Sequence, residues 1–158
     1  MTERVYEIVL VEDNPGDVML VEESLKSLRL PFHMTHCETV NIAVKTINGY
    51  GAGDGNVPDL LLLDYNLPGG EAHEVLAAAM ANPALARTRK AVITSSMSPR
   101  DHENALRRGA ECVIGKPADL DLFLGEVGSA IVKLLALQDP PADGSSSRAF
   151  GVPTVQLD

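Results

Sequence analysis

The sequence lacks tryptophan, has only two cysteines, and contains fewer basic than acidic residues. Thirteen Lys and Arg against 22 Asp and Glu give a formal net charge of −9. An acidic chain repels phosphate backbones and anionic lipids, so we expect no nucleic acid and no membrane partner. No apolar run approaches the ~20 residues of a membrane helix, and charges interrupt the N-terminal apolar stretch, which excludes a signal peptide. We therefore expect a cytoplasmic protein.

The remaining composition, 45% hydrophobic and 22% charged, is that of a globular domain. Apolar and turn patterns predict an alternation of strands and helices. The expected strands are 5–11, 32–37, 59–63, 91–96 and 111–115, and the expected helices are 17–29, 39–48, 71–81, 99–108 and 119–137. Such alternation favours an α/β fold, in which a parallel sheet carries helices on both faces. One domain over 1–137 is expected, followed by a Pro/Gly/Ser-rich tail over 138–158.

Polar residues follow the expected strands where each one ends. Glu12 and Asp13 follow the first, Asp64 the third, Thr94 falls near the end of the fourth, and Lys116 follows the fifth. In open parallel sheets functional groups gather beyond the carboxyl ends of the strands. If the first and third strands are neighbours, three carboxylates converge, and each pair ~5 Å apart repels by about 3 kcal/mol at an effective dielectric of ~20. Such a cluster indicates a hard divalent cation, and Mg²⁺ fits a small, partly hydrated site.

The same residues predict a chemistry. A carboxylate nucleophile, a metal, a lysine and a hydroxyl donor together suggest phosphoryl transfer onto Asp64. Each residue alone has an ordinary explanation, because an Asp after a strand usually caps a turn or helix and a Thr at a strand end is usually a strand former. The joint occurrence of all four features in this order is what indicates a site.

Four motifs carry a resemblance to the receiver domain of bacterial response regulators over about residues 5–137. They are VLVEDNPGD at 9–17, DLLLLDYNLPGG at 59–70, VITSS at 92–96 and GAECVIGKP at 109–117. The resemblance implies a doubly wound, flavodoxin-like parallel sheet of five strands in the order 2-1-3-4-5 with five helices. It also implies two-component, phosphorelay signalling. Several details, including NPGD after the acids, look like the single-domain receivers paired with phytochromes.

The resemblance also implies the roles of individual residues. Asp64 would accept a phosphoryl group from a histidine kinase, and Glu12, Asp13, Asp64 and the backbone carbonyl of Asn66 would hold Mg²⁺. Thr94, which the spacing from Lys116 favours over its neighbour Ser95, would contact the phosphoryl oxygens, and Lys116 would pair with them. The implied partner is a sensor histidine kinase, of which a bacteriophytochrome is one candidate, or a phosphotransfer protein. A homodimer through the fourth helix, fifth strand and fifth helix is also implied. Apart from its own phosphorylation and dephosphorylation, such a protein is not an enzyme.

One position departs from the family. Receivers usually have Tyr or Phe three residues before the lysine, as a side chain that rotates on activation, whereas this chain has Val113. Valine has one stiff torsion and no ring, so it cannot bridge the same distance. We therefore expect activation to travel through the loop from Ser95 to Pro99, which follows Thr94 directly.

Three alternative functions remain. A phosphatase with an aspartyl nucleophile would need a second Asp two residues after Asp64, where this chain has Asn66. A flavodoxin-like FMN carrier would need a hydroxyl-rich phosphate loop where this chain has two acids. A degenerate receiver, acting as a phosphorylation-independent interaction module, is disfavoured because the acidic site is complete.

Weaker expectations concern residues outside this site. The first helix should bury Leu20, Val21, Leu25 and Leu28 and expose Val18 and Met19, which would form either a kinase-docking patch or scattered surface apolars. The last helix should bury, among others, Leu120. The four histidines should lie at the surface or on edge strands, and Cys37 and Cys112 should be unpaired core residues on opposite sheet edges. The tail residues Phe150, Val152, Val155 and Leu157 should pack on the domain or on a partner.

Overall fold

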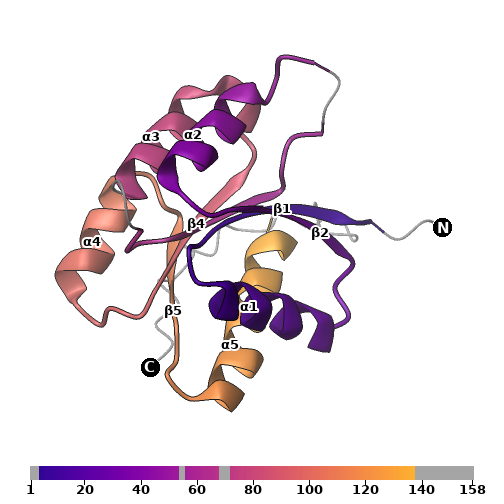
Figure 1. The fold of residues 1–158 in the computed structure, drawn as a ribbon, viewed down its shortest axis with the longest axis vertical. Coiled ribbons are helices and arrows are strands. Elements are labelled where there is room, and N and C mark those ends of the chain that lie inside the picture. Colours follow the sequence, from indigo (N-terminus) through magenta and orange to yellow (C-terminus); the bar gives the residue numbers. More distant parts are fainter. Residues whose placement is uncertain (1–3, 54–55, 68–71, 138–158) are drawn as a thin grey trace.

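The computed structural model describes residues 4–53, 56–67 and 72–137 of the 158-residue chain. Its centre is one parallel sheet in the order β2-β1-β3-β4-β5 (Figure 1). The strands are β1 Tyr6–Val11, β2 Phe32–Cys37, β3 Leu60–Asp64, β4 Arg89–Thr94 and β5 Cys112–Gly115. This order confirms the expected fold and makes β1 and β3 neighbours.

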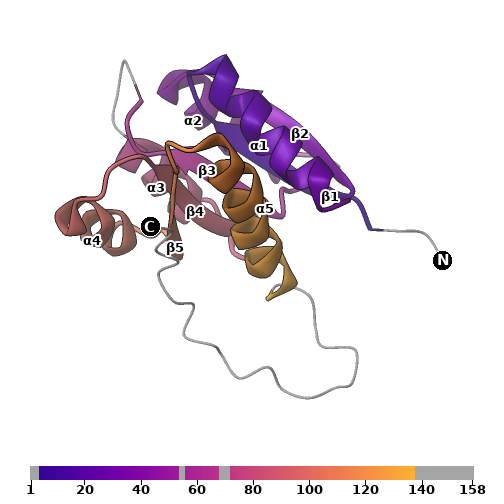
Figure 2. The same ribbon diagram turned by 90° about the horizontal axis from the view of Figure 1, so that it is seen from below.

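Helices cover both faces of the sheet (Figures 1 and 2). One face carries α1 (Pro15–Ser27) and α5 (Leu120–Ala136), which pack side by side. The other carries α2 (Val40–Gly49), α3 (Ala72–Ala81) and α4 (Pro99–Arg107), and a short 3₁₀ helix at Pro83–Leu85 precedes β4. No helix within the described part of the chain is long and apolar enough to cross a membrane.

The central strand β3 explains why this arrangement forms. All five of its residues are buried, and its leucines alternate between the two cores of the domain. Leu61 and Leu63 pack beneath α2 and α3, whereas Leu60 and Leu62 pack beneath α1 and α5. Burial of a leucine side chain contributes roughly 1.5–3 kcal/mol, so a run of four apolar residues fixes this strand in the middle of the sheet.

Helices α1 and α5 approach unusually closely at Ser24 and Gly128. The Ser24 hydroxyl donates to the carbonyl of Leu124 at 2.5 Å and accepts from the Gly128 backbone N–H at 2.7 Å. A β-carbon placed on Gly128 would lie 2.5 Å from Ser24 Oγ and 2.8 Å from the Ser24 carbonyl oxygen. Glycine is therefore required at 128 for the two helix backbones to come this close.

Three expectations about buried faces were wrong. Val18 is buried, so it forms no exposed pair with Met19, which is 63% exposed. Leu28 caps the end of α1 and Leu120 begins α5, and both are exposed rather than buried. Leu28 and Leu120 lie at the helix ends, where an apolar residue on the stripe is left exposed. Val18 instead belongs to the core cluster on the α1 and α5 side of the sheet, although the spacing placed it off the stripe.

The cysteines and histidines follow the expectations with one exception. Cys37 and Cys112 are free and buried, on the two edge strands. His33 lies exposed on β2, where it contacts the Glu7 carboxylate at 2.9 Å. His102 was expected at the surface or on an edge strand and is instead buried on α4. The prediction for the tail lies outside the described residues.

Candidate functional site

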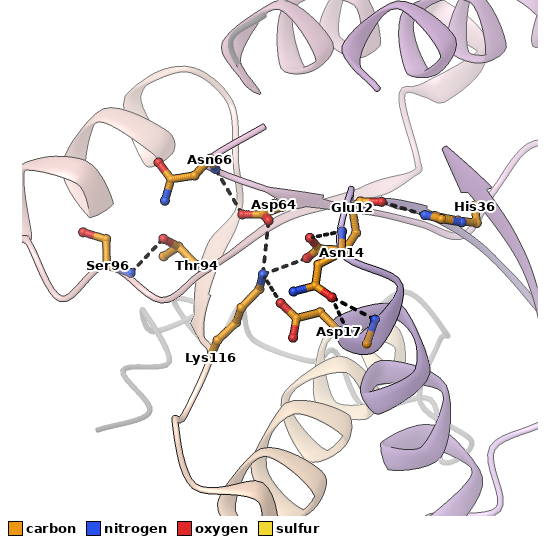
Figure 3. Close-up of polar contacts among 10 residues, drawn as sticks. Glu12, Asn14, Asp17, His36, Asp64, Asn66, Thr94, Ser96 and Lys116 are labelled. Atoms are coloured by element: carbon orange, nitrogen blue, oxygen red, sulfur yellow. Dashed lines mark hydrogen bonds and ion pairs between the residues drawn. The ribbon is translucent and has the colours of Figure 1, made fainter. Parts of the chain in front are cut away.

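The site is assembled from the carboxyl ends of four parallel strands. Asp64 is the last residue of β3 and pairs in register with Ile93, so Thr94 lies at the next position of the adjacent strand. Thr94 pairs with Gly115, and the Lys116 backbone N–H donates to the Thr94 carbonyl at 2.7 Å. The side chains expected from the strand ends therefore meet on one edge of the sheet (Figure 3).

The Lys116 ammonium is at the centre of this edge. Its Nζ donates to Glu12 Oε2 at 2.7 Å, to Asp17 Oδ2 at 2.9 Å and to Asp64 Oδ2 at 3.1 Å (Figure 3). Burial alone would lower the pKa of Lys116, but the hydrogen bonds to Glu12 and Asp17 and the charge of Asp64 more than offset it, so the pKa is raised. Lys116 is thus a fixed cation, and each of its three N–H donors has a carboxylate acceptor.

Carboxylates outnumber the cation. One oxygen each from Glu12, Asp13 and Asp64 lies within 4.8 Å of the others. Burial and a hydrogen bond with Asp64 raise the pKa of Glu12 to about 7, although Lys116 opposes this shift. Glu12 and Asp64 are almost fully buried whereas Asp13 is exposed, so the cluster opens to solvent on the Asp13 side. Clustered hard oxygen donors are the ligand set that Mg²⁺ and Mn²⁺ prefer, so the residues present fit such an ion.

Local hydrogen bonds orient these acids. Asp64 Oδ1 accepts from the Asn66 backbone N–H at 3.0 Å, which fixes the carboxylate at the start of the β3–α3 loop. Glu12 Oε1 accepts from the Asn14 N–H at 3.2 Å, and the Glu12 carbonyl is contacted by His36 Nε2 at 2.6 Å. Asn66 itself is exposed, with its backbone next to the cluster.

Thr94 connects the site to α4. It is buried, and its Oγ1 accepts from the Ser96 N–H at 3.0 Å. The Ser96 hydroxyl donates to Asp101 Oδ2 at 2.6 Å, and the Ser96 carbonyl accepts from His102 Nε2 at 2.8 Å. Both partners lie in α4, so displacement of the Thr94 hydroxyl would be felt directly at the start of that helix.

Sequence reasoning did not predict Asp17 as a site residue and placed it only where the turn after the first strand meets the helix expected over 17–29. Pro15 instead occupies the first turn of α1, where its missing N–H costs nothing. Asn14 caps the helix by accepting from the Gly16 N–H at 2.8 Å. Asp17 therefore projects from the first helical turn toward Lys116. An acidic residue in a helix turn that follows a strand-end acid pair was the available signal.

A cleft of about 490 Å³ lies beside these groups. Asp17 and Lys116 line its polar side, and Leu20, Met97 and Phe123 are among the residues lining its apolar side. Met97 is 65% exposed and follows β4 in the loop that leads to α4. The cleft gives a route from solvent to the Lys116 ammonium.

Comparisons with known proteins agree with this geometry. The chain is 33% identical over 118 residues to the response regulator Rcp1 of Synechocystis sp., a match that covers 73% of this chain and 80% of Rcp1. The chain belongs to the response regulator family. No protein-family model matches it.

Two solved structures extend the comparison with this response regulator. The phosphorylated cyanobacterial phytochrome response regulator RcpA superposes with a TM-score of 0.74 at 29% identity, covering 85% of this chain and 96% of RcpA. The Mn²⁺-bound form of Rcp1 superposes with a TM-score of 0.73 at 29% identity, covering 87% of this chain and 99% of Rcp1. The resemblance to receivers associated with phytochromes is therefore confirmed.

Proposed function

We propose that this response regulator accepts a phosphoryl group on Asp64. The observation that carries the proposal is the Asp64 carboxylate, buried at the end of β3 and held 3.1 Å from the Lys116 ammonium beside two further carboxylates. A carboxylate oxygen of Asp64 attacks the phosphorus of the donor. The bond between phosphorus and the donor's leaving group breaks, and the leaving group departs with the bonding electron pair. The product is an aspartyl phosphate.

The surrounding residues supply positioning and charge. Lys116 pairs with a phosphoryl oxygen, and the Thr94 hydroxyl donates a hydrogen bond to another. Glu12, Asp13, Asp64 and the Asn66 backbone carbonyl would hold Mg²⁺, which supplies positive charge that offsets the repulsion between the acids and an anionic donor. The Mn²⁺-bound relative Rcp1 supports this part of the proposal.

The test is labelling with acetyl phosphate in the presence of Mg²⁺, followed by intact-protein mass spectrometry. Wild type should gain one phosphoryl group, and Asp64→Asn should gain none while keeping its circular dichroism spectrum. Asp121→Asn removes an equivalent charge from an exposed position at the start of α5 and should label normally. Stable labelling of Asp64→Asn at the wild-type rate would contradict the assignment, and an unlabelled wild type would favour the degenerate-receiver alternative.

The metal proposal has its own test. Asp13→Ala removes the exposed carboxylate of the cluster and should weaken Mn²⁺ binding, measured by electron paramagnetic resonance of free Mn²⁺, by roughly ten- to a hundredfold. An unchanged affinity would remove Asp13 from the ligand set.

The proposed donor is a sensor histidine kinase, a bacteriophytochrome being one candidate, or a phosphotransfer protein. The relatives' association with phytochromes supports a photoreceptor kinase. The exposed apolar side chains Met19, Leu120 and Leu122 lie on α1 and α5, the helices beside the cleft, and are the proposed docking surface. The protein would then act as a cytoplasmic switch and not as an enzyme with a separate substrate.

We further propose that residues 1–137 form the receiver domain, with the tail over 138–158 as an addition. The output would pass through a homodimer that uses α4, β5 and α5. Sedimentation of the full chain, measured with and without beryllofluoride, should show a dimer in at least one of the two states. A strict monomer in both states would exclude this route.

A further inference from the structure

All three N–H donors of the Lys116 ammonium are engaged, so none is free to bind an incoming phosphoryl group. Its three acceptors are Glu12, Asp17 and Asp64 at 2.7, 2.9 and 3.1 Å, and an ammonium group has three N–H donors. A phosphoryl group on Asp64 can pair with Lys116 only if one of these contacts gives way. The identity of that contact decides how readily the site changes state.

Asp17 differs from the other two acceptors. Glu12 and Asp64 belong to the carboxylate cluster proposed to hold Mg²⁺, whereas Asp17 lies outside it. Asp17 also lies on the wall of the cleft, on the opposite side of Lys116 from Asp64 (Figure 3). It therefore draws the ammonium away from the phosphoryl acceptor.

The position of Asp17 is fixed by its helix. Asn14 caps α1 at its first turn, and the Ser24 and Gly128 contacts hold α1 against α5 further along. The Asp17 side chain is 26% exposed, while the Lys116 side chain is only 10% exposed. The backbone of Asp17 is therefore fixed by α1, and its carboxylate can hold the Lys116 ammonium at a constant position.

We propose that Asp17 is a positioning residue that holds the Lys116 ammonium on the α1 side of the site and so opposes its transfer to an incoming phosphoryl group. The inference rests on the proposed function of Asp64. Removal of the Asp17 charge leaves Lys116 attached to Glu12 and Asp64, so the lysine stays in the site and is freer to pair with phosphate.

The experiment measures the initial rate of phosphorylation by acetyl phosphate with Mg²⁺, using the full chain. Asp17→Asn should react faster than wild type by roughly two- to fivefold, the upper part of the range expected for loss of one partly exposed ion pair. Asp17→Glu keeps the charge within reach of Lys116 and should restore the slow rate. Asp121→Asn, which removes a first-turn acid from α5, should leave the rate unchanged.

Salt separates positioning from simple repulsion of the anionic donor. Long-range repulsion falls when the screening length shortens from ~14 Å at about 0.05 M salt to ~4 Å at about 0.5 M, whereas a contact between neighbouring groups is screened much less. The acceleration in Asp17→Asn should therefore persist at the higher salt concentration.

Four results would overturn the inference: an Asp17→Asn rate within twofold of wild type, a slower rate, an equal acceleration in Asp121→Asn, or an acceleration that vanishes in salt. If wild type itself is not phosphorylated, the proposed function of Asp64 fails and the inference falls with it. Phosphorylated wild type with an unchanged Asp17→Asn rate contradicts only the role of Asp17.

Discussion

Replacement of Lys116 by methionine would test the electrostatic balance of the site. Each of its three carboxylate contacts, at 2.7 to 3.1 Å, corresponds to roughly 5–6 kcal/mol of gross attraction at an effective dielectric of ~20. Burial of the lysine offsets much of that attraction. Removal of one partner from a buried ion pair nonetheless costs about 3–5 kcal/mol, because the remaining charges are left uncompensated. We expect Lys116→Met to lose about 3 kcal/mol of unfolding free energy at pH 8 without metal.

The loss should depend on pH in a defined direction. In the wild type, the pKa of Glu12 is raised from 4.5 to about 7, so this group lowers the unfolding free energy as pH rises between those values. Without Lys116 the pKa of Glu12 rises further, which extends the unfavourable window above pH 7. The deficit of Lys116→Met should therefore be larger at pH 8 than at pH 5.

Magnesium should restore part of the unfolding free energy that Lys116→Met loses. Lys116 competes with a divalent cation for Glu12 and Asp64, so Mg²⁺ should bind the variant more tightly and raise its unfolding free energy more than that of wild type. Urea unfolding followed by far-ultraviolet circular dichroism measures both effects, since the chain has no tryptophan to report by fluorescence. Lys133→Met, which removes a charge from the exposed face of α5, is the control. Equal Mg²⁺ stabilisation of wild type and Lys116→Met would refute the reasoning.

Three further predictions concern the rest of the domain. Gly128→Ala should destabilise the fold by about 1–3 kcal/mol, measured by urea unfolding, because the new methyl group would overlap Ser24; an unchanged midpoint would contradict the close approach. Burial raises the pKa of Cys112 to about 12, so only about one thiol in 10⁴ is ionised at pH 8 and alkylation by iodoacetamide should be slow until urea unfolds the chain. Beryllofluoride should shift the amide resonances of 95–99 more than that of Val113, and the opposite ranking would show that activation travels through β5.

The central strand β3 could be predicted from the sequence because its residues 60–63 are all leucine. A strand without polar residues on either face must be buried on both faces, as β3 is. The start of β4 was harder, since the strand begins at Arg89 and not at 91. Lys90 is buried there, with its Nζ donating to the carbonyls of Leu85 and Thr88 at 2.8 Å. No periodic pattern signals a lysine whose charge is satisfied by backbone carbonyls.

The site shows the same division. The convergence of Asp64 and Lys116 was predictable because the carboxyl ends of parallel strands share one edge of the sheet. The contact of Asp17 with Lys116 was not, because it depends on where α1 begins and on how the lysine side chain is oriented. NPGD reads as a turn, and Pro15 is equally suited to a turn or to the first position of a helix.

The close contact between α1 and α5 at Ser24 and Gly128, called the seam below, limits which segments can be exchanged between relatives. Consider a chimera that joins the first part of this receiver to the last helix of a relative. Here such a joint would succeed only if the incoming helix carries a hydrogen at the position of Gly128, since the Ser24 hydroxyl and carbonyl occupy the space of any side chain. Because Asp17 and Ser24 share α1, and Lys116 shortly precedes α5, a poor match at the seam would also move the acid that holds the lysine. A donor helix for this protein should therefore be chosen by that one residue before overall sequence similarity is considered.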